Sequence, residues 1–155
     1  MKGQTPVLAV NSNRDKLNII GGLCWDGKIL AQITTETMTG EDTKVFLEYV
    51  LTQIPGKIVM VLDNSRLHRN QLVSEFVAGE ERLEVEFLPP YAPELNPIEL
   101  LWGWVKRFWL GNRVIRSVGE LFGLWEDGLA VAAGLPGLAQ GFFGRLEEKL
   151  GMVST

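Results

Sequence analysis

Residues 57–62 read KIVMVL, and Asp63 follows them directly. A continuous run of β-branched and other apolar residues is typical of a strand buried on both faces, often in a parallel arrangement. In open α/β sheets, ligands gather at the carboxyl ends of such strands. An aspartate at a strand end is equally often a turn or cap residue, so Asp63 alone leaves both interpretations open.

The segments before this strand predict an antiparallel pair and a helix. Two apolar runs, LNIIGGLCW and KILAQIT, are joined by Asp26-Gly27. This dipeptide favours a tight hairpin turn, so a β-hairpin is predicted over 17–34. Apolar residues at helical spacing then predict a helix over 41–54, with acidic residues at its positive end.

Strands and helices alternate after Asp63, and further helices close the chain. The predicted elements are a strand over 57–63 that includes Asp63, a helix over 70–79, a half-exposed strand over 83–88, a helix over 96–110 and helices over 117–150. An antiparallel pair followed by strand–helix alternation predicts an α/β fold, with a mixed β-sheet flanked by helices. The length of 155 residues suits a single domain over 1–155.

Composition excludes several classes of protein. Hydrophobic residues make up 46% of the chain and charged residues 22%, which is enough apolar material for a core and excludes a disordered chain. The apolar runs fall far short of a bilayer span, so no membrane partner is expected. The one cysteine, Cys24, is expected to serve packing, and a cytoplasmic location follows. The net charge of −4 argues against holding nucleic acid by overall field, but leaves room for a local basic face.

Glu99 occupies a position with two interpretations. Asn96 suits a helix N-cap, Pro97 the first helical residue, and Glu99 the position that completes a reciprocal cap. Glu99 also lies at the margin of the buried stripe of this helix, with Lys106 two turns later on the same side. The carboxylate could bind a metal while the cation binds a phosphate, or the two could form a surface ion pair that contributes little to stability.

Three stretches together resemble a known family. They are VLDNSRLH at 61–68, FLPPYAPELNPIELLWGWVKR at 87–107 and, more loosely, GQTPV at 3–7. They resemble the catalytic core of the DDE transposases, in particular the mariner-type group and its bacterial insertion-sequence relatives. The resemblance extends from residue 3 to about residue 125, and the proline-rich approach to Asn-Pro-Ile-Glu is its most specific part.

The resemblance implies an RNase H-like fold, a DDE endonuclease acting in DNA transposition, and DNA partners, both transposon ends and target. Asp63 would be the second acidic metal ligand and Glu99 the third. Carboxylate oxygens suit Mg²⁺ or Mn²⁺, and a two-metal site is expected in the intact enzyme. Two such ions activate the attacking oxygen and stabilise the leaving one at phosphorus, which gives DNA cleavage or strand transfer.

The family also needs a first aspartate, on a central strand upstream of GQTPV, and neither Asp15 nor Asp26 is a convincing substitute. We therefore expect the first, central strand to be missing, leaving the hairpin and the 57–63 strand with unpaired edges. The chain then reads as an N-terminally truncated or split transposase that alone neither cuts nor joins DNA. An upstream half of the same transposase and a second copy in a homodimer are further candidate partners.

Other residues have weaker signals. Asn64 could orient the Asp63 carboxylate, although turn chemistry explains it equally well. His68, the single histidine, is expected in a surface or capping role, with a role near a phosphate as the second interpretation. Four cations in a locally basic segment are the predicted DNA-binding residues: Lys106, Arg107, Arg113 and Arg116. A solvated helix flank is the alternative for them.

Two rival functions remain open from the sequence. A ribonuclease H or resolvase-type nuclease would share the fold, but it does not account for the Pro-Glu-Leu-Asn-Pro-Ile-Glu context. A catalytically dead relict would only bind DNA or oligomerise. Metal titration separates the readings, because two carboxylates without a third should bind Mn²⁺ weakly.

Overall fold

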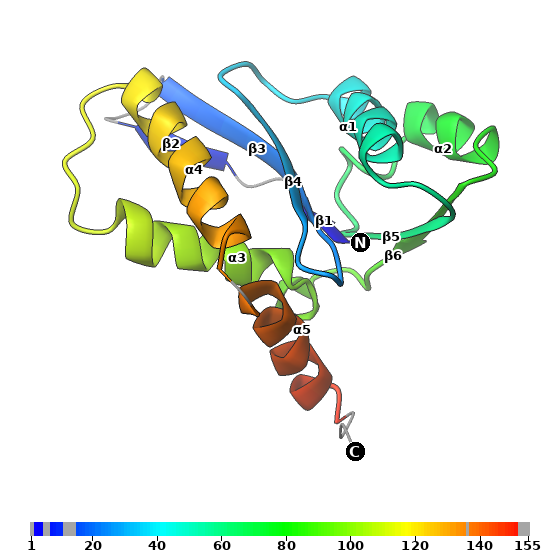
Figure 1. Ribbon diagram of the computed structural model, residues 1–155. Helices are drawn as coiled ribbons and strands as arrows, with labels where there is room; N and C mark the ends of the chain where they lie inside the picture. Colours follow the sequence, from blue (N-terminus) through cyan, green and yellow to red (C-terminus); the bar gives the residue numbers. More distant parts are fainter. Residues whose placement is uncertain (1, 5–6, 11–14, 136, 152–155) are drawn as a thin grey trace.

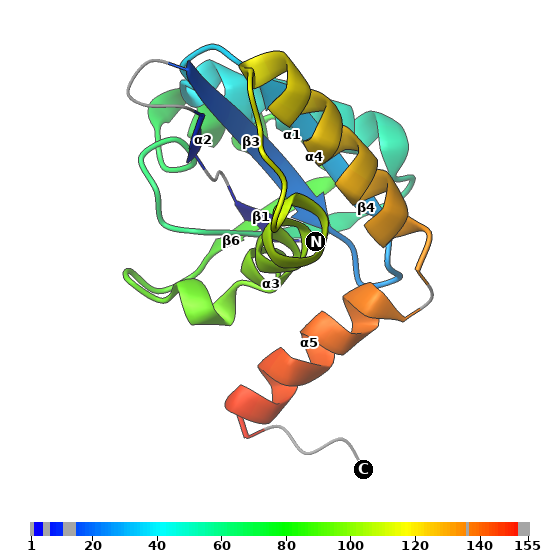
Figure 2. The same ribbon diagram turned by 90° about the vertical axis from the view of Figure 1, so that its left-hand side faces the viewer.

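The computed structural model describes residues 2–4, 7–10, 15–135 and 137–151, and within them a mixed sheet of six strands carries helices on both faces (Figures 1 and 2). The strands are β1 (Lys2–Gln4), β2 (Val7–Val10), β3 (Asp15–Leu23), β4 (Ile29–Thr34), β5 (Ile58–Leu62) and β6 (Leu83–Phe87). The predicted mixed α/β fold is confirmed. Thr5 and Pro6 of the GQTPV stretch lie outside the described residues.

The hairpin forms where Asp26-Gly27 predicts it. β3 and β4 are antiparallel, with Leu23 opposite Ile29. Gly27 has a φ of 98°, a backbone conformation that glycine adopts without steric cost. The Asp26 carboxylate accepts a hydrogen bond from the backbone N–H of Lys28 at 3.0 Å and so closes the turn.

The centre of the sheet differs from the expectation. β1 lies between β3 and β5: Gly3 is opposite Gly22 in the antiparallel pair and opposite Leu62 in the parallel pair. The expectation that the hairpin and β5 would have unpaired edges is therefore wrong, because residues 2–4 supply backbone partners to both. β2 extends the sheet against β3 in an antiparallel pair.

The helices separate into two layers. They are α1 (Gly40–Gln53), α2 (Gln71–Ala78), a 3-10 turn η1 (Pro93–Leu95), α3 (Ile98–Trp104), a π-helical turn η2 (Val105–Leu110), α4 (Val118–Ala133) and α5 (Leu138–Lys149). Figure 2 shows α4 and α3 in front of the sheet and α1 and α2 behind it. The helix predicted over 96–110 is helical from Ile98 onward, but its second half is π-helical.

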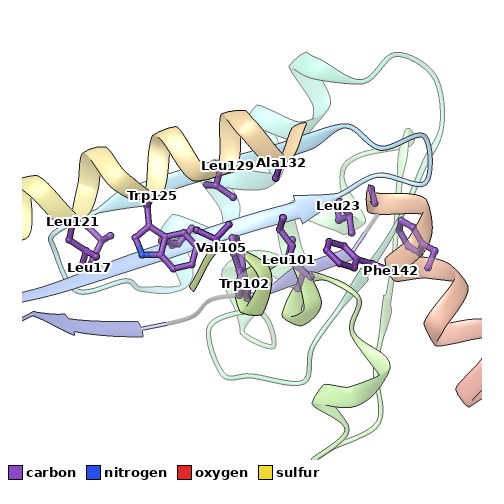
Figure 3. Packing of buried hydrophobic residues seen from close by; sticks show 14 residues of the cluster. Leu17, Leu23, Leu101, Trp102, Val105, Leu121, Trp125, Leu129, Ala132 and Phe142 are labelled. Carbon is purple, nitrogen blue, oxygen red and sulfur yellow. The ribbon is translucent and has the colours of Figure 1, made fainter. Parts of the chain in front are cut away.

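Each sheet face has its own apolar cluster because side chains alternate along a strand. On β3, Leu17 and Ile19 belong to the cluster under α3 and α4, whereas Ile20 belongs to the cluster under α1. Figure 3 shows the first cluster, in which Trp102 of α3 and Trp125 of α4 lie between the helices and the sheet. The helices are therefore held by burial of apolar surface, at roughly 25 cal/mol per Å².

β5 is buried on one face only. Met60 is fully buried under α1 and α2, but Val59 on the other face is 49% exposed. The prediction of burial on both faces is wrong here, because α3 packs against β1 and β3 and leaves the outer face of β5 uncovered. β6 alternates as predicted, with Leu83 buried and Glu84 exposed.

No helix in the described ranges is both long enough and apolar enough to span a bilayer.

Candidate active site

Asp63 lies at the carboxyl end of β5, where the chain turns towards α2. Its Oδ1 accepts a hydrogen bond from the backbone N–H of Ser65 at 2.9 Å. Its side chain is 21% exposed and opens onto a surface pocket of about 330 Å³. One wall of this pocket is residues 63–65 and the other is residues 88–93. The carboxylate is therefore held by the backbone and remains accessible to a ligand.

His68 is fully buried behind this carboxylate, so the expected surface role is wrong. Its Nδ1 lies 3.2 Å from the hydroxyl of Thr43 in α1, and that hydroxyl donates to the carbonyl of Leu67 at 2.7 Å. Because a hydroxyl has one proton to donate, Nδ1–H is the donor to Thr43. The Nε2 atom then faces Asp63 Oδ1 at 3.6 Å and has no hydrogen-bond partner among the described residues.

The electrostatics of His68 follow from its position. Burial lowers the pKa of His68, because the imidazolium loses its hydration, and the negative charge of Asp63 opposes that shift. The ring is therefore neutral in the folded protein near neutral pH. Thr43 of α1 and His68 of the turn before α2 thus form a buried polar pair behind the Asp63 carboxylate.

The Asn64 side chain binds Arg69. Its Oδ1 accepts a hydrogen bond from the Arg69 Nη1 at 2.8 Å, while Ser65 supplies the backbone donor on Asp63. The Arg69 guanidinium also lies over the ring of Phe87, 5.1 Å from its centroid. Asn64, which lines the pocket, thus holds the Arg69 guanidinium by a hydrogen bond.

Glu99 lies in the first turn of α3, and its side chain is half-buried. Pro97 is the N-cap of this helix, and the buried Asn96 precedes it. The Asn96 Oδ1 accepts from the Ile98 N–H at 3.4 Å, and the Asn96 carbonyl accepts from the Glu99 N–H at 3.1 Å. Trp102 anchors the helix on the sheet at Gly21, where an added Cβ would lie 2.5 Å from the Trp102 ring. The helix that carries Glu99 is therefore rigidly placed.

The Asp63 pocket is connected to Glu99 through the chain. Its second wall, residues 88–93, ends at η1, which leads into the start of α3. Over the described ranges, no cluster of three or more His, Cys, Asp or Glu side chains forms a metal site. The donor chemistry of Asp63 nevertheless fits a hard cation, because Mg²⁺ is commonly bound by one or two carboxylates plus water and substrate phosphate.

The four predicted DNA-binding cations, Lys106, Arg107, Arg113 and Arg116, are all exposed, in η2 and the connection to α4. The guanidinium of Arg107 lies over the ring of Phe108 at 5.2 Å, and that of Arg113 over the ring of Trp109 at 5.3 Å. This group of cations lies at the opposite end of the α3–η2 helix from Glu99.

Sequence reasoning missed Thr43, Arg69 and Tyr91. Thr43 is far from His68 in the chain, so no local pattern could connect them. Arg69 and Tyr91 lie inside or beside the motif stretches, but their exposure becomes evident only in the structure. Cys24 is buried as expected, and burial, with the nearby Asp26 charge, raises its pKa to about 11.

Comparison with known proteins identifies the family. The model of the DDE superfamily endonucleases matches residues 1–122. The chain belongs to this family. Both Asp63 and Glu99 lie within the matched residues, so the resemblance drawn from the proline-rich motif is confirmed.

One relative is similar over part of the chain. The uncharacterized protein y4pE/y4sA of Sinorhizobium fredii is 32% identical over 63 residues, which is 41% of this chain and 44% of that protein. The chain therefore spans less than half the length of this relative.

Solved structures show the fold. The catalytic domain of Mos1 mariner transposase has a TM-score of 0.69 at 13% identity, covering 99% of this chain and 83% of that one. The Mos1 mariner paired end complex with Mn has a TM-score of 0.65 at 13% identity, covering 91% of this chain and 52% of that one. The expected RNase H-like architecture is confirmed by this similarity.

Proposed function

We propose that this chain is the catalytic-core portion of a DNA transposase, in which Asp63 and Glu99 bind divalent metal ions and act on DNA phosphodiesters. The observation that supports it is the position of Asp63, accessible at the end of β5 in a pocket whose second wall leads directly to α3 and Glu99. Family membership supports the endonuclease chemistry. The complex of the Mos1 relative with Mn supports divalent metal dependence.

The roles of the residues follow from their contacts. Asp63 would hold a Mg²⁺ or Mn²⁺ ion with a carboxylate that the Ser65 N–H orients. Glu99 would contribute a second carboxylate from the start of α3. Ions bound there activate the attacking oxygen and stabilise the leaving one in an in-line displacement. Lys106, Arg107, Arg113 and Arg116 would contact DNA phosphates.

Metal binding tests the proposed ligands. We expect Mn²⁺ titration, followed by electron paramagnetic resonance, to give weak binding that Asp63→Asn and Glu99→Gln each weaken further. Glu84→Gln, on the exposed side of β6, is the matched control and should leave the Mn²⁺ affinity unchanged. Equal Mn²⁺ affinity in wild type, Asp63→Asn and Glu99→Gln would contradict the proposal.

The expected inactivity of the polypeptide alone is tested on plasmid DNA. The wild-type polypeptide alone is expected to leave supercoiled plasmid intact. Metal-dependent nicking abolished by Asp63→Ala would overturn that expectation of inactivity while supporting the proposed site.

The partners follow the same proposal. Transposon ends and target DNA are the proposed substrates, and a second copy of the chain or an upstream half of the transposase remains a predicted partner. The cytoplasmic location remains a prediction from the single cysteine.

A further inference from the structure

Tyr91 has two properties that are unusual for an aromatic residue. Its side chain is fully exposed, at 101%, and its backbone φ is 57°, in the left-handed region that few residues other than glycine adopt. Such a conformation costs on the order of 1 kcal/mol or more and tends to occur at functional sites. Because the Tyr91 ring is fully exposed, no burial of apolar surface offsets the cost of this backbone conformation.

The position of Tyr91 relates it to the candidate active site. It lies in the segment Leu88–Pro93, which forms the wall of the pocket opposite Asp63. Pro89, Pro90 and Pro93 restrict the backbone around it, because each proline fixes its own φ and limits the residue before it. The ring is thus presented to solvent beside Asp63 by a stiff loop, with little conformational entropy left to lose on binding.

A cation, Arg69, is bound to a residue that lines the pocket. The Arg69 guanidinium donates to Asn64 Oδ1 at 2.8 Å and lies over the Phe87 ring. Asn64 itself lines the pocket next to Asp63. Arg69 is exposed, so the guanidinium N–H groups that do not bind Asn64 can donate to an anion. One wall of the pocket therefore has an exposed aromatic ring, and a lining residue of the other wall, Asn64, binds a cation.

We infer that Tyr91 and Arg69 form a binding site for unpaired DNA beside Asp63, in which Tyr91 stacks on a base and Arg69 contacts a backbone phosphate. The identity of the ligand as DNA rests on the proposed function. Stacking of a base on an aromatic side chain is worth about 1–3 kcal/mol and needs a base face that is free of its neighbours. The site therefore selects a single-stranded or frayed strand over intact duplex.

Binding of a single-stranded 20-nucleotide DNA of mixed sequence, measured by fluorescence anisotropy in EDTA, tests this inference. Tyr91→Asn removes the ring but keeps a residue that tolerates a positive φ, and it should weaken binding about 10-fold or more. Tyr91→Phe keeps the ring and should bind within about 2-fold of wild type. Equal affinity of wild type and Tyr91→Asn, or no binding by wild type, would overturn the inference.

A base analogue reports stacking directly. With a single 2-aminopurine placed in the same oligonucleotide, binding by wild type and by Tyr91→Phe should quench its fluorescence, and binding by Tyr91→Asn should quench it less. The corresponding blunt duplex should bind wild type and Tyr91→Asn equally. A duplex affinity that falls as much as the single-strand affinity would overturn the stacking role.

The Arg69 contact has a separate signature. Loss of one phosphate contact should lower the slope of log K against log[salt] by about 0.7 for single strands, so Arg69→Ala should show this change. Arg145→Ala removes an exposed cation of α5 and should not change the slope. An unchanged slope in Arg69→Ala would overturn the role of Arg69.

The failure of this inference is distinguishable from that of the proposed function. Asp63→Asn should lose Mn²⁺ affinity but retain single-stranded DNA binding in EDTA. Tyr91→Asn should retain the wild-type Mn²⁺ affinity, because Tyr91 is not a metal ligand. Normal metal binding with no effect of Tyr91→Asn on DNA would remove the stacking site and leave the proposed metal site standing.

Discussion

Both faces of the sheet bury an apolar cluster, but only the α1 and α2 side also buries a polar pair next to Asp63. Under α3 and α4, the cluster is aromatic and aliphatic, and Trp102 meets Trp125 edge to face with ring centroids 5.7 Å apart. Behind β5, at the α1 and α2 side, Thr43 and His68 are buried as a hydrogen-bonded pair against Asp63. Burying polar groups costs stability unless they are paired. The first region therefore stabilises the fold, and the second prepares the surroundings of one carboxylate.

The largest effect should come from the first region. Trp102→Ala leaves a cavity between α3 and Gly21, and replacing a buried aromatic by alanine costs about 3–5 kcal/mol. Urea denaturation followed by circular dichroism measures the loss. Trp102→Phe should cost much less, because it retains a ring and removes an N–H that has no acceptor within the described ranges. A Trp102→Ala variant as stable as wild type would show that this cluster does not carry the fold.

The polar pair should have an intermediate effect. Thr43→Val keeps the shape of the side chain but leaves His68 Nδ1 without its partner, which costs about 1–3 kcal/mol. Thr43→Ser keeps the hydroxyl and is the matched control, expected to retain most of the stability in the same urea experiment. Equal losses in Thr43→Val and Thr43→Ser would mean that packing, not the hydrogen bond, decides this position.

The smallest effect is a pH dependence of stability. Burial lowers the pKa of His68 from its ordinary value of 6.5, so below that pH the unfolded chain binds a proton that the folded chain does not. The His68 contribution to stability is therefore present above pH 6.5 and is lost as pH falls through 6.5 towards the lower folded pKa. Urea titrations in EDTA at several pH values should show a steeper decline for wild type than for His68→Gln.

Asp63→Asn sharpens this comparison. The charge of Asp63 raises the pKa of His68 and so opposes the effect of burial. Removing it should lower the pKa of His68 further and extend the decline to more acidic pH. If the free energy of unfolding of wild type and of His68→Gln declined in parallel with pH, a neutral buried His68 would be contradicted.

Local patterns predicted the elements well. The hairpin turn at Asp26-Gly27 and the alternation in β6 depend on neighbouring residues, so the sequence carries their signal directly. Asn96 was predicted as the N-cap of α3, but the helix begins at Ile98 with Pro97 at its N-cap, and the Asn96 side chain accepts from the Ile98 N–H. Asp63 and Glu99 were singled out through the motif context, and their joint metal role remains a prediction.

The errors concern contacts between segments far apart in the chain. β5 reads as doubly buried, yet Val59 is exposed because α3 packs over β1 and β3 instead. β1 pairs with both neighbours although its three residues carry no strand signal. His68 reads as a surface residue, but α1 covers it and supplies Thr43.

The sequence by itself determined the family, the order of the elements and the candidate carboxylates, because motifs, turns and helical periodicity are local. Only the tertiary structure decided that β1 lies at the centre of the sheet, that His68 is buried behind Asp63, and that Tyr91 lines the same pocket as Asn64, which binds Arg69. The physical reason is that burial and side-chain partners depend on which distant segments pack together. Hydrophobic burial and backbone pairing select that packing over the whole chain at once.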